Sequence, residues 1–124
     1  PLAYDGAELM DIVYIRGVSA STTIGVYDHE RDIKQDLKID LEMAFNNRAA
    51  GASDDVTDAL DYDAISKRTL EYVEVSQHFL IEAVAENLSQ LLLDEFPIEQ
   101  LTLTISKPGA VSAANEVGIK IVRP

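Results

Sequence analysis

The sequence contains no cysteine, so disulfide bonds, thiolate metal sites and cysteine nucleophiles are excluded, and nothing in it points to an oxidising compartment. Basic side chains are also scarce, because 10 lysines and arginines stand against 22 carboxylates and leave a formal net charge of -12. An acidic surface repels nucleic-acid phosphates and anionic lipids. We therefore expect no nucleic-acid partner, no membrane partner and a cytoplasmic location.

Long apolar runs are missing as well, since none approaches the roughly 20 residues of a transmembrane helix. The start, PLAYDGAEL, lacks the basic and apolar zones of a signal peptide, so we expect a protein that is neither anchored nor exported. Met10 stands immediately before the first strand-like pattern. We interpret residues 1–9 as an N-terminal extension, natural or left by an expression vector, and residues 10–124 as one domain.

Alternation of apolar and polar side chains predicts strands near both ends of the domain. Between residues 36 and 45 every odd position is apolar and four of the five even positions are charged, which is typical of a strand with one buried face. Residues 11–25 are rich in Ile, Val, Thr and Tyr, and Gly17 interrupts them where a bulge would be tolerated. Alternation returns at the end of the chain, with two apolar sets: Leu101, Leu103 and Ile105, then Val117, Ile119 and Ile121.

Helical spacing of apolar residues appears in the middle of the chain. Residues 64–75 and 79–95 each carry one such stripe, the second ending before Pro97. The stripes consist of Ile65, Thr69, Tyr72 and Val73, and of Ile81, Val84, Ala85, Leu88, Leu91 and Leu92. Residues 26–33 connect the first two strands. Residues 46–61 are rich in Asn, Gly, Ser, Asp and Ala and are predicted to form a loop, with Asp61 or Asp63 capping the next helix.

The predicted order is therefore strand, strand, helix, helix, strand, strand. This ββααββ order favours an α+β domain in which two helices cover one face of a four-stranded antiparallel sheet. Such a sheet leaves two exposed edges, and a small domain can protect them by pairing with neighbouring subunits to close a ring. We therefore expect a homo-oligomer.

Lys107 is the most informative single residue, because strand parity places it on the same face as Leu101, Leu103 and Ile105. A partly desolvated ammonium gives up its proton more readily than a solvated one and can serve as an acid or base. The alternative is an edge lysine that discourages aggregation, or the solvated end of a strand. Lys107, Pro108, Gly109 and Ala110 also fit a type II turn, which would hold the lysine at its first position.

Three further residues have both a structural and a functional interpretation. Glu82 precedes Glu86 by four positions near a helix start, where a carboxylate either stabilises the helix dipole or accepts two hydrogen bonds from a planar, amidine-like ligand. Tyr62 is a rim aromatic or a positioned phenol. Glu30 lies in a polar connection where a charged side chain is most often solvated.

The sequence contains no recognisable metal site and no motif for a nucleotide cofactor or a serine nucleophile. His29 and His78 show no ligand spacing with each other or with nearby carboxylates, so we predict no metal. Motifs for nucleotide cofactors and serine hydrolases, GxGxxG, the Walker motif and GxSxG, do not occur. Any reaction therefore has to proceed without these groups, and we expect no cofactor.

Four segments resemble the dihydroneopterin aldolases in order and spacing, over residues 10–123. They are TTIGVYDHE around Gly25 and Glu30, SDDVTDALDYDAI around Tyr62, FLIEAVAE around Glu82, and ISKPGA around Lys107. The resemblance implies the tunnelling fold, in which ββααββ units form tetrameric rings that stack into an octamer. It also implies active sites between adjacent subunits.

Carried over by position, the resemblance implies that Lys107 is the general acid and base. Glu82 and the backbone of Ile81 would anchor a pterin, and Tyr62 and Glu30 would be further contacts, with Tyr62 assisting catalysis. The implied reaction is retro-aldol cleavage of 7,8-dihydroneopterin in folate biosynthesis, with epimerisation at the 2' carbon as a side activity.

Two alternatives remain at this point. One is an epimerase of dihydroneopterin or its triphosphate, although a triphosphate would favour clustered basic residues and only Arg31 and Lys34 lie close in sequence. The other is a pterin-binding protein without turnover.

Overall fold

The computed structural model describes residues 10–124, so the predicted extension over residues 1–9 lies outside the described part of the chain. The strands are β1 (Ile12–Thr22), β2 (Gln35–Ala44), β3 (Gln100–Pro108) and β4 (Glu116–Arg123). The helices are α1 (Asp28–Arg31), α2 (Arg48–Ser53), the 3-10 turn η2 (Val56–Asp58), α3 (Tyr62–Val75) and α4 (Ile81–Glu95). The predicted ββααββ order is confirmed for the larger elements.

The four strands form one antiparallel sheet in the order β1-β2-β3-β4, so β1 and β4 are its edges. The pairing of β1 with β2 shifts between Ile15 and Val18. Gly17 adopts a positive φ of 75° at that shift, and its N–H donates to the Asp40 carboxylate at 2.7 Å. The bulge predicted at Gly17 is therefore confirmed.

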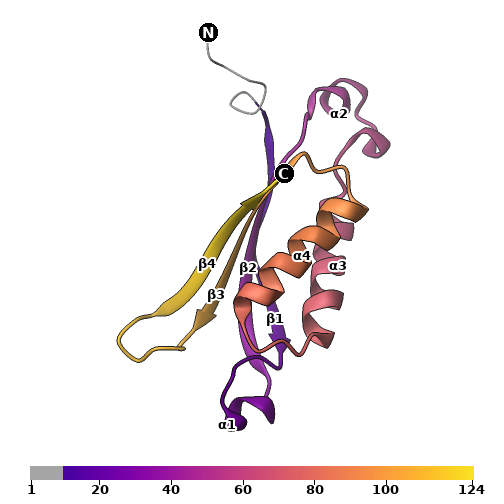
Figure 1. Cartoon of the computed structure of the whole chain (residues 1–124). Coiled ribbons are helices and arrows are strands. Elements are labelled where there is room, and N and C mark those ends of the chain that lie inside the picture. Colours follow the sequence, from indigo (N-terminus) through magenta and orange to yellow (C-terminus); the bar gives the residue numbers. More distant parts are fainter. Residues whose placement is uncertain (1–9) are drawn as a thin grey trace.

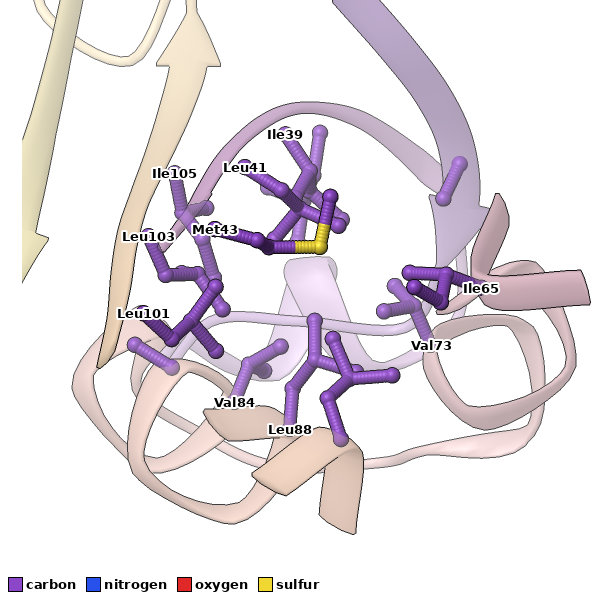
Figure 2. Close-up of a cluster of buried hydrophobic side chains, with 14 of the residues drawn as sticks. Ile39, Leu41, Met43, Ile65, Val73, Val84, Leu88, Leu101, Leu103 and Ile105 are labelled. Atoms are coloured by element: carbon purple, nitrogen blue, oxygen red, sulfur yellow. The ribbon is translucent and has the colours of Figure 1, made fainter. Parts of the chain in front are cut away.

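Helices α3 and α4 cover the same face of the sheet (Figure 1), and the core lies between them and the strands (Figure 2). The side chains that fill it are fully buried: Leu37, Ile39, Leu41 and Met43 from β2, Leu101, Leu103 and Ile105 from β3, and Ile65, Val73, Val84, Leu88 and Leu92 from the helices. Thr69 is tolerated in this layer because its hydroxyl donates to the Ile65 carbonyl at 2.8 Å. Each large side chain buried in this way contributes about 1.5–3 kcal/mol of hydrophobic stabilisation.

Two short helices correct the prediction of unbroken loops. Helix α2 lies inside the segment 46–61, and α1 lies inside the connection 26–33. Three of the six residues of α2, RAAGAS, are alanine, the best helix former, and Asp54 ends the helix in the left-handed conformation with φ 57°. The fold thus has two long and two short helices among the described residues, where the sequence predicted two in all.

The N-cap of α3 is Asp61, whose carboxylate accepts a hydrogen bond from the Ala64 N–H at 3.0 Å. This choice confirms one of the two predicted caps. Helix α4 ends at Glu95, two residues before Pro97, as predicted. The two helices run in opposite directions across the sheet (Figure 1). The start of α4 consequently lies toward the same end of the molecule as α1.

Candidate active site

A shallow pocket of about 180 Å³ lies where the end of β1, the start of α4 and the end of β3 meet. It is lined by Ile24, Gly25, Val26, Phe79, Leu80, Ile81, Glu82 and Lys107. Three of the five predicted site residues, Ile81, Glu82 and Lys107, line this pocket, and Glu30 contacts it through Lys107. The fold thus brings together residues from segments that are far apart in the sequence.

Lys107 and Glu30 form an ion pair, with 2.9 Å between Nζ and Oε2. The lysine and glutamate side chains are only 16% and 13% exposed, so the pair is shielded from solvent. Lys107 lies on the face of β3 that carries Leu103 and Ile105, as strand parity predicted. No local sequence pattern predicts a counter-charge for this lysine, and the structure supplies one in Glu30.

Glu30 is held in place by several donors. Beyond Lys107, its Oε1 accepts from the Tyr27 N–H at 3.2 Å, and its Oε2 accepts from the Gln35 side-chain amide at 3.3 Å. The hydrogen bond from Lys107, followed by that from the Tyr27 N–H, lowers the pKa of Glu30 from 4.5 to about 2. The Gln35 amide also donates to the Ile24 carbonyl at 2.7 Å. Glu30 is therefore an ordered carboxylate anion at neutral pH.

Gly25 forms the wall beside this carboxylate. Its N–H donates to the Phe79 carbonyl at 3.0 Å, and its φ of 120° is a conformation that residues with a side chain rarely adopt. A Cβ at this position would also overlap the Glu30 carboxylate. Only glycine satisfies both conditions, because the backbone passes close to the carboxylate while its N–H bonds to the Phe79 carbonyl.

The opposite wall is the N-terminus of α4. Its N-cap residue, Leu80, provides no side-chain cap, and the first N–H groups of a helix have no intrahelical acceptor. The N–H groups of Ile81 and Glu82 are therefore available to an acceptor in the pocket. Glu82 is exposed, in the first turn as predicted, whereas Glu86 pairs with Arg123 at 2.6 Å. The pocket thus offers a carboxylate acceptor beside backbone donors.

Tyr62 does not belong to this pocket within one chain. It is the first residue of α3 and is 63% exposed. A helix of 14 residues is about 21 Å long. Residues 79–82, which line the pocket, follow the other end of α3, where the chain turns into α4. The structure therefore places Tyr62 at the end of α3 away from the pocket that Lys107 lines.

Three residues contribute to the site in ways that the sequence did not predict: Gly25, Arg31 and Gln35. An isolated glycine after a strand pattern is a turn signal, so the turn at Gly25 could have been predicted. Arg31 and Gln35 act through contacts with distant backbone, which no local pattern reveals.

Within residues 10–124, no group of three or more His, Cys, Asp or Glu side chains is arranged to hold a metal ion. Among the same residues, no helix has the length and apolar character needed to cross a membrane.

A half-buried lysine paired with an ordered carboxylate, at a pocket that also offers backbone donors and a second carboxylate, defines a small-molecule enzyme of the acid–base type. Comparison with known proteins identifies the family. The sequence profile described as FolB, dihydroneopterin aldolase, matches residues 13–122. The chain therefore belongs to the dihydroneopterin aldolase family.

Individual relatives agree with this assignment. The chain is 47% identical to the dihydroneopterin aldolase of Escherichia coli (strain K12) over 114 residues, which cover 92% of this chain and 93% of the relative. It is 42% identical to that of Haemophilus influenzae, covering 92% and 97%. A crystal structure of the E. coli enzyme in complex with neopterin superimposes with a TM-score of 0.91, covering 93% of this chain and 100% of the other.

Proposed function

We propose that this enzyme cleaves the side chain of 7,8-dihydroneopterin in a retro-aldol reaction that releases 6-hydroxymethyl-7,8-dihydropterin and glycolaldehyde. The observation that carries the proposal is the shielded Lys107–Glu30 pair facing a helix N-terminus that bears Glu82. Family membership supports the substrate class. The reaction is a step of folate biosynthesis, and we place it in the cytoplasm.

Glu82 and Ile81 anchor the pterin ring in this proposal. The Glu82 carboxylate accepts two hydrogen bonds from the 2-amino and N3 edge of the ring, a planar pair of donors that suits a carboxylate. The Ile81 N–H, at the start of α4, donates to an acceptor on the same edge. Holding the ring at one wall leaves its side chain directed to Lys107, which converts binding energy into orientation.

Lys107 assists the loss of the 2'-hydroxyl proton by accepting it, directly or through water. The bond between carbons 1' and 2' then breaks, glycolaldehyde leaves, and the electron pair moves into the imine beside the side chain to give an enamine. Glu30, at 2.9 Å, stabilises the ammonium that Lys107 becomes. Protonation at carbon 1', assisted by Tyr62 and Lys107, completes the reaction.

The substrate itself supplies the electron sink in this scheme. Other aldolases create one with a lysine Schiff base or a metal ion. Because dihydroneopterin already contains an imine, the protein has to provide only binding, orientation and proton transfer. We therefore propose a reaction without a cofactor.

The same intermediate explains a 2'-epimerase side activity. Glycolaldehyde that adds back to the enamine with its other face forms 7,8-dihydromonapterin. The unphosphorylated substrate is favoured over the triphosphate, because the Arg31 guanidinium is engaged with three backbone carbonyls and does not line the pocket.

We propose that Tyr62 reaches the pocket of a neighbouring subunit. Two features support this arrangement: Tyr62 is exposed at the end of α3 away from the pocket, and β1 and β4 are the edge strands of the sheet. Pairing β1 of one copy with β4 of the next would remove both edges and close a ring. Two tetrameric rings would then stack into the octamer implied by the family resemblance.

Incubation with 7,8-dihydroneopterin followed by chromatography tests the reaction, with 6-hydroxymethyl-7,8-dihydropterin, glycolaldehyde and the 2' epimer as the measured products. Lys107→Ala should still bind neopterin but lose turnover by on the order of 10²–10⁴-fold, the usual contribution of a general acid or base. Lys120→Ala is the matched control, because Lys120 is an exposed lysine of the neighbouring strand β4. Full turnover by Lys107→Ala would disprove the assignment, and no product from the wild type would disprove the reaction.

Mixing two inactive variants tests the shared site. If Tyr62 comes from a neighbour, Lys107→Ala and Tyr62→Phe subunits that are unfolded and refolded together should regain about a quarter of the wild-type sites, because random assembly produces intact pairs at that frequency. Recovery no greater than the sum of the two separate variants would contradict a shared site.

A further inference from the structure

Arg31 follows the site residue Glu30 directly, but its guanidinium contacts a different set of groups. Nη1 donates to the Gly25 carbonyl at 2.9 Å and to the His78 carbonyl at 3.0 Å, and Nη2 donates to the Gln77 carbonyl at 2.7 Å. The guanidinium carbon also lies 4.3 Å from the centre of the Phe79 ring. One side chain thus connects the turn at Gly25 to the segment 77–79.

These two segments are the walls of the pocket. Gly25 lies beside the Glu30 carboxylate, and residues 77–79 lead directly into Leu80, Ile81 and Glu82. Between the segments there is one backbone hydrogen bond, from the Gly25 N–H to the Phe79 carbonyl. Neither segment belongs to the sheet. The contacts of Arg31 and the Gly25–Phe79 hydrogen bond join them directly, and the Thr22 hydroxyl, which donates to the Ser76 carbonyl at 2.7 Å, is a further anchor next to residue 77.

The contacts of Arg31 are those of a residue that holds backbone segments in place, and not those of a residue that binds an anionic group. All three of its hydrogen bonds go to carbonyl oxygens, and the ion pairs formed among residues 10–124 by arginine involve Arg68 and Arg123 instead. A planar guanidinium can hold three carbonyls in one fixed arrangement, whereas a lysine ammonium acts as a single point charge on a flexible stem. Hydrogen bonds from a charged donor are also stronger than neutral ones.

We propose that Arg31 is a positioning residue: it fixes the separation of the Gly25 turn and the segment 77–79, and thereby the distance from the Lys107–Glu30 pair to Glu82. Neighbouring residues of α1 then serve the site in two ways, with Glu30 ordering the lysine and Arg31 setting the width of the pocket. The kinetic part of this inference depends on the proposed function.

Substitution of Arg31 separates positioning from a general loss of stability. In Arg31→Met the pocket loses its fixed width while Lys107 and Glu30 remain, so KM for dihydroneopterin and the Kd for neopterin should rise on the order of tenfold or more, with a smaller fall in kcat. Arg31→Lys should show a similar rise, because charge alone does not hold three carbonyls.

Arg68→Met is the matched control. Arg68 is also a partly exposed arginine, and it bonds the Glu95 carboxylate at 2.9 and 3.1 Å between α3 and α4, away from the pocket. It should lower the melting temperature without changing KM. A KM within about twofold of wild type in folded Arg31→Met or Arg31→Lys, or an equal rise in Arg68→Met, would overturn the inference.

A measurement without substrate distinguishes failure of this inference from failure of the proposed function. Amide hydrogen exchange at Gly25, whose N–H bonds to the Phe79 carbonyl, should accelerate in Arg31→Lys and stay at the wild-type rate in Arg68→Met. Unchanged exchange at Gly25 in Arg31→Lys would overturn the inference even if the wild type proved inactive. An inactive wild type with accelerated exchange would overturn only the proposed function.

Discussion

Gly25→Ala should damage this protein more than the same change at another glycine with positive φ. An alanine at φ 120° lies outside the left-handed well, and backbone strain of this kind costs about 1–3 kcal/mol. The added Cβ would also meet Cδ, Oε1 and Oε2 of Glu30 well inside the 3.0 Å limit of real contacts. The carboxylate must then shift, which disturbs its 2.9 Å contact with Lys107.

Gly17→Ala provides the comparison, because Gly17 has a φ of 75° but no neighbouring atom within 4 Å of an added Cβ. It should cost only the left-handed strain of about 1–2 kcal/mol and leave turnover unchanged. Gly25→Ala should cost more and reduce kcat/KM by on the order of a hundredfold, since misplacing a group at the site by about one ångström has effects of that size.

Urea unfolding at one fixed protein concentration, combined with steady-state kinetics, measures both effects. The double variant Gly25→Ala, Glu30→Ala adds a stringent condition. With the carboxylate removed the overlap disappears, so the two changes should cost less together than the sum of their separate costs. Additive costs, or equal effects of Gly17→Ala and Gly25→Ala on turnover, would refute the reasoning.

Two further predictions concern stability. The pKa of Glu30 is about 2 in the folded protein against an ordinary 4.5, so its contribution to the free energy of unfolding is complete above about pH 4.5 and is lost as the pH falls toward 2. The free energy of unfolding should therefore fall less steeply over this window in Glu30→Gln than in the wild type. Equal slopes of unfolding free energy against pH in the two proteins would contradict this prediction. Ser89 is 1% exposed, and its hydroxyl has no hydrogen-bond partner among the described residues, so Ser89→Ala should raise stability by about 1 kcal/mol or more. A lower urea midpoint in this variant would count against that explanation.

The larger elements could be predicted because their side chains repeat with the period of the structure. Leu37, Ile39, Leu41 and Met43 alternate along β2 and are all fully buried. The short helices α1 and α2 could not be predicted in this way, since four or six residues are too few to display a helical period. The composition of residues 46–61 also led to a wrong prediction of an unbroken loop, because the alanines of α2 stand among Asn, Gly, Ser and Asp.

The site was predictable only in part. Strand parity placed Lys107 on the core face, but its partner lies 77 residues earlier in the chain, and no local pattern connects the two. Resemblance supplied Glu30, Glu82, Ile81 and Tyr62 as candidates without saying which of them meet within one chain. The three-dimensional fold separates Tyr62 from the others.

The Lys107–Glu30 contact also constrains the order of events during synthesis. The β1–β2 hairpin can form early, because its strands are adjacent in the chain, but Glu30 then lacks its cation until β3 has joined the sheet. A contact across 77 residues closes a long loop, which is slow to form compared with local structure. A nascent chain that stops before β3 therefore has Glu30 without its lysine partner, and the ion pair forms only when the sheet has been assembled around it.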